Sequence, residues 1–242
     1  MNEKPYIVDE TDNFAVAFKP PRMHSVPLRK GGGDTMLDWY AALFPPIMEI
    51  SGRRAGEGGL LHRLDYETQG LMLFAKNQKS LDHLLAAQEE GNFIKEYAAI
   101  CHKNVPANAS YPAPNSPFSF TGFVIESYFR PFGPGRKQVR PALDNRGKGR
   151  SAAQDRNGCY RTEIASVAEN DYCHFALRLR RGFRHQIRCH LAWIGCPILN
   201  DPLYGEQPAS DDYMALRASG LIFADPQNGI AREYRIESFG NH

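Results

Sequence analysis

The 242-residue chain lacks the features that mark several protein classes. It has no run of 18 apolar residues, so we expect no membrane-spanning helix. Residues 1–10 do not show the basic-then-apolar pattern of a secretory signal. The five cysteines are odd in number and include no C-x-x-C pair, which argues against a disulfide framework and a zinc ribbon. The sequence therefore predicts a cytoplasmic protein without a membrane partner.

Signatures of common cofactor sites are also missing. The segment KGGGD, residues 30–34, does not end in the G-K-[ST] of a phosphate-binding loop, and no G-x-S-x-G serine-hydrolase motif occurs. His185, Cys189 and His190 fall on different faces of an expected helix, which disfavours a zinc site. We therefore expect neither a metal nor any other cofactor.

Positive charge is concentrated in two windows, although the formal net charge is only +2. Residues 130–150 contain seven basic residues and one acidic residue, and residues 178–190 contain five arginines and no acid. The remainder of the chain has 17 basic and 26 acidic residues. Such concentration is typical of a surface that binds a polyanion such as RNA or DNA. Solvated surface arginines are the alternative, and charge alone leaves both open.

Hydrophobic alternation and turn residues predict the secondary structure. Strands are expected at 6–10, 13–19, 71–76, 93–102, 160–170 and 172–180, and helices at 35–44, 81–90 and 184–195. The expected helix caps are Asp34 for the first helix and Asn77 or Ser80 for the second. Residues 104–120 and the basic segment 130–150 are expected to be loops. Because strands and helices mingle without a regular βαβ rhythm, we predict a single α+β domain, residues 1–242, with a mixed, mainly antiparallel central sheet flanked by helices.

One segment, GLLHRLDYETQGLMLFAKN at residues 59–77, places His62, Arg63 and Asp65 directly before an apolar strand. A lone aspartate before a turn is more often a local cap than a catalytic group. On this segment alone, a catalytic role for Asp65 is therefore the less favoured of two interpretations.

A second segment, RHQIRCH at residues 184–190, changes that balance. Arg184 and Arg188 lie four residues apart and are expected to share one face of a helix, whose apolar residues Ile187, Leu191 and Ile194 pack inward. An arginine that emerges between core residues needs a carboxylate partner. We predict that Arg188 pairs with Asp65 and keeps that carboxylate ionised, as a nucleophile or base requires.

The same segments carry a family resemblance. Residues 62–77, HRLDYETQGLMLFAKN, resemble the H-R-L-D-x-x-T-S-G-L-L-L-F-A-K signature of the RluA family of pseudouridine synthases. RHQIRCHLAWIGCPILNDPLYG is similar to that family's H-Q-I-R-x-H-L-A block, AVAFKPPRMHSVP to its early K-P stretch, IKEYAAI to its K-x-Y-x-A segment, and LIFADPQNG to its closing L-x-F-x-H-P-x-x-G. The matches follow the family's order, and the chain is identified as a member.

The resemblance implies an isomerase that converts specific uridines of ribosomal or transfer RNA to pseudouridine without a cofactor. Asp65 matches the nucleophile that acts on a flipped-out base, Tyr97 the tyrosine that stacks on that base, and Arg188 the partner of the aspartate. Arg63 matches an arginine that enters the RNA stack where the base has left. His62, Arg184, Leu71 and Ile187 would also contact the substrate, the last two as apolar walls.

Further expectations follow from the same resemblance. RNA would be bound through segments 130–150 and 178–190 by a monomer. The S4 RNA-binding module that often precedes this catalytic domain is not expected, because the first catalytic strand is predicted within a few residues of Met1.

Three positions depart from the family pattern: Gln69 replaces a serine, Phe183 an arginine and Asn200 a glycine. These departures keep open a non-catalytic RNA-binding or chaperone protein with the same fold. A glycosidase-like hydrolase is a third interpretation, with Glu67 as the only local candidate for the second carboxylate.

Overall fold

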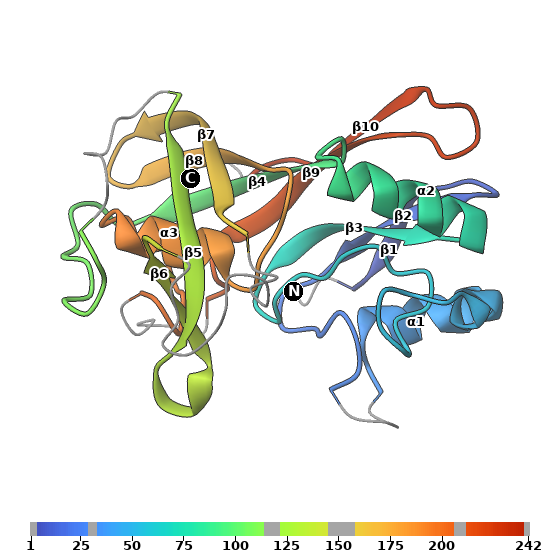
Figure 1. Ribbon diagram of the computed structural model, residues 1–242, viewed down its shortest axis with the longest axis horizontal. Helices are drawn as coiled ribbons and strands as arrows, with labels where there is room; N and C mark the ends of the chain where they lie inside the picture. The colour runs from blue at the N-terminus through green and yellow to red at the C-terminus, as the bar shows by residue number, and fades with distance from the viewer. Residues whose placement is uncertain (1–3, 29–32, 114–121, 145–157, 206–211, 240–242) are drawn as a thin grey trace. The chain divides into compact units, whose positions relative to one another are not determined.

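The computed structural model describes residues 4–28, 33–113, 122–144, 158–205 and 212–239. Ten strands and three α-helices lie within these ranges (Figure 1). The chain divides into two compact units, the first of residues 1–96 and 217–242 and the second of residues 97–216. In the described part of the chain, none of the helices has the length and apolar character needed to span a bilayer.

The first unit is built on a mixed sheet. Its strands follow the order β1 (Tyr6–Glu10), β2 (Phe14–Lys19), β3 (Gln69–Ala75), β9 (Leu216–Ala224) and the start of β4 (Ile94–Cys101), with β10 (Ala231–Arg235) paired to β9. The β1–β2, β2–β3 and β9–β10 pairs are antiparallel, whereas β3 runs parallel to β9. The strands expected at 6–10 and 13–19 are confirmed as β1 and β2, whereas β9 and β10 were not predicted.

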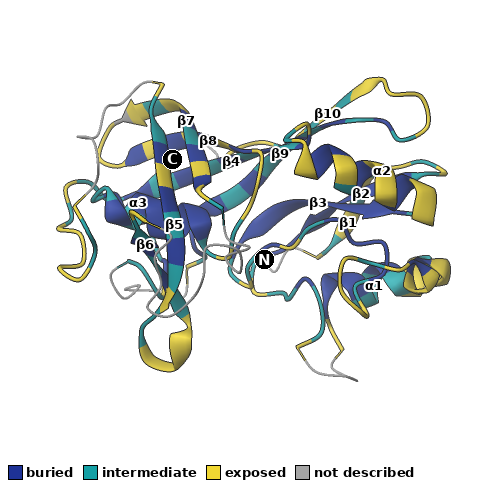
Figure 2. Cartoon of the chain, in the orientation of Figure 1, coloured by how far each residue is buried: buried dark blue, intermediate teal, exposed yellow. Residues whose placement is uncertain are grey.

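Strands β2 and β3 are buried along their whole length (Figure 2). Both faces of these strands are covered, because helices α1 (Met36–Leu43) and α2 (Gln78–Glu89) lie on opposite sides of them in Figure 1. Tyr40 of α1 stacks on Phe74 of β3 with ring centroids 4.5 Å apart. A short 3-10 helix, η1 (Pro45–Glu49), follows α1. Strand β3, which follows residues 62–68 in the chain, is therefore packed on both faces.

The helix caps differ in part from expectation. Thr35, not Asp34, caps α1: its hydroxyl accepts from the Asp38 N–H at 3.2 Å, and the Asp38 carboxylate accepts from the Thr35 N–H at 3.3 Å. Asp34 has a left-handed φ of 64°, whereas an N-cap residue is extended. The prediction of Asp34 was therefore wrong by one residue. Asn77 is confirmed as the cap of α2, with the Ser80 N–H donating to its side chain at 2.9 Å.

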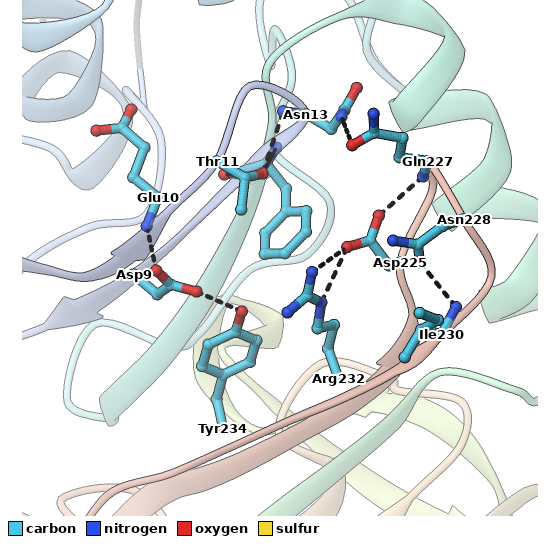
Figure 3. Close-up of polar contacts among 11 residues, drawn as sticks. Asp9, Glu10, Thr11, Asn13, Asp225, Gln227, Asn228, Ile230, Arg232 and Tyr234 are labelled. Atoms are coloured by element: carbon cyan, nitrogen blue, oxygen red, sulfur yellow. Dashed lines mark hydrogen bonds and ion pairs between the residues drawn. The ribbon is translucent and has the colours of Figure 1, made fainter.

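Polar contacts fasten the β9–β10 hairpin to the β1–β2 hairpin (Figure 3). The Tyr234 hydroxyl donates to Asp9 at 2.6 Å, and the Asn13 amide donates to Gln227 at 3.2 Å. Within the β9–β10 hairpin, Arg232 Nε donates to the Asp225 carboxylate at 2.9 Å. The first two contacts join residues that are more than 200 positions apart in sequence.

The second unit is built on a sheet in which the β8–β7, β7–β5 and β5–β6 pairs are antiparallel. The strands follow the order β4, β8 (Cys173–Leu179), β7 (Tyr160–Glu169), β5 (Val124–Phe132) and β6 (Gln138–Ala142), and helix α3 (Gln186–Trp193) packs on β6 and β7. In β8 the predicted alternation is confirmed: Phe175, Leu177 and Leu179 are buried, and His174, Arg178 and Arg180 are exposed.

The expectation of a loop at 130–150 was wrong as far as residue 142. Strand β5 continues to Phe132, and residues 138–142 return as β6 after a short 3-10 turn, η2 (Pro134–Arg136). The prolines in this segment are typical of turns, so the two strands were not recognised from the sequence. Their hydrogen-bonded pairing depends on contact with the neighbouring strand. Residues 145–150 lie outside the described residues.

The predicted fold class is confirmed. The protein is α+β, with a mixed, mainly antiparallel sheet flanked by helices. The expectation that residues 1–242 act as one domain stays a prediction.

Candidate active site

Asp65 lies at the start of a turn that leads into β3. Its backbone carbonyl accepts from the Thr68 N–H at 3.1 Å, and its side chain is partly exposed. The residue before it is fixed by Ser25, which is only 4% exposed. The Ser25 hydroxyl donates to the Leu64 carbonyl at 2.8 Å and accepts from the Leu64 N–H at 3.0 Å. The N–H and the carbonyl of Leu64, the residue before Asp65, are thus both hydrogen-bonded to one buried side chain.

The other side of the turn is held by Lys19, a fully buried lysine at the end of β2. Its ammonium donates to the carbonyls of Pro20 at 2.8 Å and Met23 at 2.7 Å, and lies 3.4 Å from the carbonyl of Tyr66. A lysine is tolerated in this apolar setting because carbonyl oxygens replace its hydration shell. The Asp65 segment is therefore connected to the β2 terminus as well as to Ser25.

The charge of Lys19 depends on the same turn. Burial lowers the pKa of Lys19 to about 7, and the negative charges of Asp65 and Glu67 oppose that shift. Glu67 also forms a long ion pair with Arg22, at 3.9 Å. Glu67, the candidate second carboxylate of a hydrolase, is thus engaged with a cation.

The turn ends at Gly70, where a side chain would not fit. Gly70 has φ +125°, and a Cβ there would lie 2.3 Å from the carbonyl oxygen of Ala218 on β9. The neighbouring departure from the family pattern, Gln69, is 5% exposed and accepts from the Arg217 guanidinium at 3.1 Å. Gln69 therefore accepts a hydrogen bond from an arginine of the adjacent strand β9.

Arg188 forms a buried, bidentate ion pair with Asp201. Its Nε and a terminal guanidinium nitrogen donate to the two carboxylate oxygens at 2.8 and 2.7 Å, and the side chains are 3% and 0% exposed. Asp201 also accepts from the N–H groups of Leu203 and Tyr204 at 2.9 and 3.1 Å. Sequence reasoning did not anticipate Asp201, which fixes the orientation of the Arg188 guanidinium.

The expectation that Arg184 and Arg188 share a helix face was wrong. Helix α3 begins only at Gln186, because His185 has a left-handed φ of 56° and interrupts the helical path. Arg184 is exposed, and its guanidinium donates to the backbone carbonyls of Arg136 and Gln138 at 3.0 and 3.1 Å. It ties the start of α3 to the β5–β6 turn.

The other two departures from the family pattern have local explanations. Phe183 stacks on Phe129 with centroids 5.0 Å apart and an interplanar angle of 6°, and lies 4.9 Å from Tyr160. It is partly buried and packs against an aromatic cluster. Asn200 has a left-handed φ of 59°, which asparagine adopts more readily than most residues, so it can replace glycine.

The remaining predicted residues occupy varied environments. Arg63 is 46% exposed and lies 3.4 Å from Glu57, so its guanidinium faces solvent in part. Leu71 and Ile187 are buried core residues, and Tyr97 of β4 is 8% exposed. The ring nitrogens of His62 are buried, and neither has a hydrogen-bond partner among the described residues.

The predicted site residues are divided between the two units. His62, Arg63, Asp65 and Leu71 belong to the first, and Tyr97, Arg184, Ile187 and Arg188 to the second. The pairing of Asp65 with Arg188 therefore stays a prediction.

The histidines that raised the possibility of a zinc site have other partners. The His190 ring nitrogens lie 2.8 Å from the Thr162 hydroxyl and 2.9 Å from the Ser127 hydroxyl. Burial lowers the pKa of His190 to about 3, so the ring is neutral. His185 Nδ1 lies 3.2 Å from the Tyr204 hydroxyl. Over the described ranges, no three potential metal ligands are grouped.

Comparison with known proteins identifies the fold and its lineage. A family model described as RNA pseudouridylate synthase matches residues 13–193. The chain belongs to the RNA pseudouridylate synthase family. The match covers about three quarters of the chain, includes Asp65, Tyr97 and Arg188, and confirms the membership predicted from the sequence motifs.

Among curated proteins, the chain is similar to the ribosomal large subunit pseudouridine synthase D of Haemophilus ducreyi, with 30% identity over 239 residues. The match covers 92% of this chain and 64% of that protein. The protein of the same name from Haemophilus influenzae is 28% identical over 244 residues, covering 94% of this chain and 65% of the relative. The chain thus spans about two thirds of the length of these relatives.

Solved structures agree at the level of the fold. Human RNA pseudouridylate synthase domain containing 4 matches with a TM-score of 0.64 and 18% identity, covering 96% of this chain and 88% of that one. Human RNA pseudouridylate synthase domain containing 1 has the same TM-score at 20% identity, with 97% and 84% coverage. Both share the architecture described above.

Proposed function

We propose that this chain is an RNA pseudouridine synthase, an isomerase that converts selected uridines of structured RNA to pseudouridine. The observation that carries the proposal is Asp65, an aspartate within the family match, in a turn whose backbone is fixed by Ser25 and Lys19. A nucleophile held on such a scaffold is preorganised for attack. The names of the relatives favour ribosomal RNA of the large subunit as substrate, with transfer RNA as the alternative.

The proposed reaction conserves all atoms of the nucleotide. Asp65 acts as nucleophile on the target nucleotide, and the bond between the ribose C1′ and uracil N1 breaks. The uracil turns, C1′ bonds to C5, the proton on C5 leaves, N1 gains a proton, and the Asp65 carboxylate is released unchanged. The reaction needs no redox partner and no external energy source.

Each of the other proposed catalytic residues supplies one function. Tyr97 stacks on the extruded base, and Arg188 pairs with the Asp65 carboxylate. The bidentate contact with Asp201 supports this role because it leaves little rotational freedom in the Arg188 guanidinium. Arg63, which is half exposed, occupies the space that the base leaves in the RNA stack.

RNA would bind to basic groups at the β5–β6 turn and the start of α3. Arg136 and Lys137 are exposed at the tip of this hairpin, and Arg184 is exposed beside it. Phosphate contacts through these side chains make RNA affinity strongly dependent on salt. His62, Leu71 and Ile187 are proposed to line the site, and a monomeric, cytoplasmic enzyme is part of the same proposal.

The three departures from the family pattern give no support to a non-catalytic protein. Gln69 binds Arg217, Phe183 fills an aromatic cluster and Asn200 adopts a left-handed turn conformation. None of these contacts removes a proposed catalytic group. Each of the three residues therefore has a local structural role.

The test is tritium release from RNA carrying 5-tritiated uridine, measured for the wild type, Asp65→Asn and Asp82→Asn. Asp82 is an exposed aspartate of α2 and serves as the matched control. We expect release by the wild type and the control, and none by Asp65→Asn, which should still bind the RNA. Residual turnover by Asp65→Asn would exclude Asp65 as nucleophile, and free uracil in the products would point to a hydrolase.

A further inference from the structure

Lys95, on β4, is a buried cation without a counter-ion in the described part of the chain. The residue is only 5% exposed, and its ammonium has no hydrogen bond or ion pair among the described residues. The ammonium nitrogen is not one of the fully solvent-excluded atoms, so it keeps some contact with solvent. The charged group that acts on it most strongly is a second cation, Arg53. A cation with so little exposed area loses much of its hydration, and a bound anion would offset that loss.

His62, near the same Phe93 ring as Lys95, has buried ring nitrogens without hydrogen-bond partners among the described residues. Both nitrogens are out of contact with solvent, although at least one carries a hydrogen that must be donated. The His62 and Phe93 rings lie 5.7 Å apart, and the Lys95 ammonium lies 5.9 Å from the same Phe93 ring. Lys95 also contributes to lowering the pKa of His62 to about 3. The Phe93 ring thus lies near both an ammonium without a counter-ion and a buried imidazole without a hydrogen-bond partner among the described residues.

The nearby carboxylates are committed elsewhere. Glu57 pairs with Arg63 at 3.4 Å, and Glu89 pairs with Arg53 at 3.3 Å. Glu96, the next residue of β4, falls on the opposite face of the strand and pairs with Arg235 at 2.8 Å. The charged group that acts on Lys95 is thus a cation, and the carboxylates of these three glutamates pair with arginines.

We propose that Lys95 and His62 form a subsite for a phosphate group of the RNA. Phosphate oxygens accept hydrogen bonds from an ammonium and from an imidazole N–H, and the negative charge removes the cost of the buried cation. His62 lies three residues before Asp65, so at most about 11 Å of extended chain separates their Cα atoms. The phosphate is consequently that of the target nucleotide or of a direct neighbour. This assignment rests on the proposed function, since it takes RNA as the ligand.

The proposal predicts an unusual combination of effects for Lys95→Met. Methionine fills a similar volume without a charge, so the variant should unfold at the same temperature as the wild type or at a higher one in phosphate-free buffer. The same variant should bind RNA about 10- to 100-fold more weakly at low salt, as expected for the loss of one charge-assisted hydrogen bond. The slope of log Kd against log salt should decrease by about 0.7–0.9. A purely structural lysine would show the opposite: a lower unfolding temperature and unchanged RNA binding.

Inorganic phosphate tests the subsite without RNA. At constant ionic strength, phosphate should raise the unfolding temperature of the wild type and of Lys79→Met, in which an exposed lysine of α2 is replaced. The increase should be clearly smaller for Lys95→Met and for His62→Phe, which keeps an aromatic ring and removes the nitrogens. An equal response of all four proteins overturns the proposal.

The two arms separate this inference from the function on which it rests. If the wild type modifies RNA but Lys95→Met binds RNA and phosphate as tightly as the wild type, the subsite is wrong and the enzyme assignment stands. If the wild type neither binds nor modifies RNA, the enzyme assignment fails, and the phosphate response of Lys95→Met still decides whether an anion site exists.

Discussion

The Arg188–Asp201 pair offers the sharpest test of how this site is held together. Replacing Asp201 with alanine leaves the Arg188 guanidinium, 3% exposed, without the carboxylate that accepts two of its hydrogen bonds. Breaking a buried pair by removing one partner costs about 3–5 kcal/mol. The loss of acceptors for the Leu203 and Tyr204 N–H groups adds to that cost.

For a chain of this size, each kcal/mol corresponds to roughly 2–4 °C, so the unfolding temperature of Asp201→Ala should fall by roughly 6–20 °C. Urea unfolding followed by circular dichroism gives the free energy directly. Asp82→Ala, at an exposed position, should change stability by no more than about 0.5 kcal/mol.

A double variant separates the energy of the Arg188–Asp201 interaction from the cost of removing only one of its two charges. Arg188→Met with Asp201→Leu removes both charges and leaves apolar groups of comparable size, and should recover a large part of the stability lost in Asp201→Ala. If Asp201→Ala costs less than about 1 kcal/mol, or if the double variant is as unstable as the sum of its single changes, the buried pair does not carry the energy assigned to it. Either result would refute the argument.

Three further predictions concern residues that hold the Asp65 turn or the core of α3 in place. Gly70→Ala should lower the free energy of unfolding by at least about 1–3 kcal/mol, because φ is +125° and the new Cβ would lie 2.3 Å from the β9 backbone. Ser25→Ala should lower kcat while changing KM less, and should lower the free energy of unfolding by about 1–3 kcal/mol, because both backbone groups of Leu64 lose their hydrogen-bond partner. The wild type should lose stability as the pH falls, and in His190→Gln that loss should be smaller by about 1.4 kcal/mol per pH unit, measured by urea unfolding at pH 4.0–5.5.

The sign of the pH effect follows from burial. The pKa of His190 is lowered from 6.5 to about 3, so between these values the unfolded chain binds more protons than the folded one. Its contribution to stability is complete above about pH 6.5 and is lost as the pH falls toward 3. An unchanged slope in His190→Gln would contradict this, as would wild-type stability in Gly70→Ala. Ser51→Ala, at an exposed serine, is the control for Ser25→Ala, and equal kcat values for the two would argue against the support role.

Local pattern was sufficient for much of the fold. The alternation in β8, the cap at Asn77 and the apolar run of β3 are properties of neighbouring residues, and all three were predicted. The hairpin of β5 and β6 was not, because prolines and arginines obscure its alternation and its pairing depends on the opposite strand. Strands β9 and β10 were missed for a related reason: β3 recruits β9 from about 150 residues away.

The candidate site divides in the same way. Asp65, Tyr97 and Arg188 were singled out by motif, and the family match that contains them is confirmed. The roles of Ser25 and Lys19 could not be read from the sequence, although KPP at residues 19–21 marks the segment, because each acts on the backbone of a distant turn. Arg188 was assigned a carboxylate partner from sequence, but the observed Asp201 contact depends on how the loop after α3 folds back.

The sequence by itself determined the order of reactive residues, the identity of the family and the elements whose period is local. Tertiary structure alone decided which cation meets which acceptor: Lys19 a set of carbonyls, Arg188 the Asp201 carboxylate, and Lys95 none within the described residues. The reason is physical. A repeat of two or 3.6 residues fixes the face on which a side chain lies, whereas the energy of a buried charge depends on groups that the chain brings near it from far along the sequence.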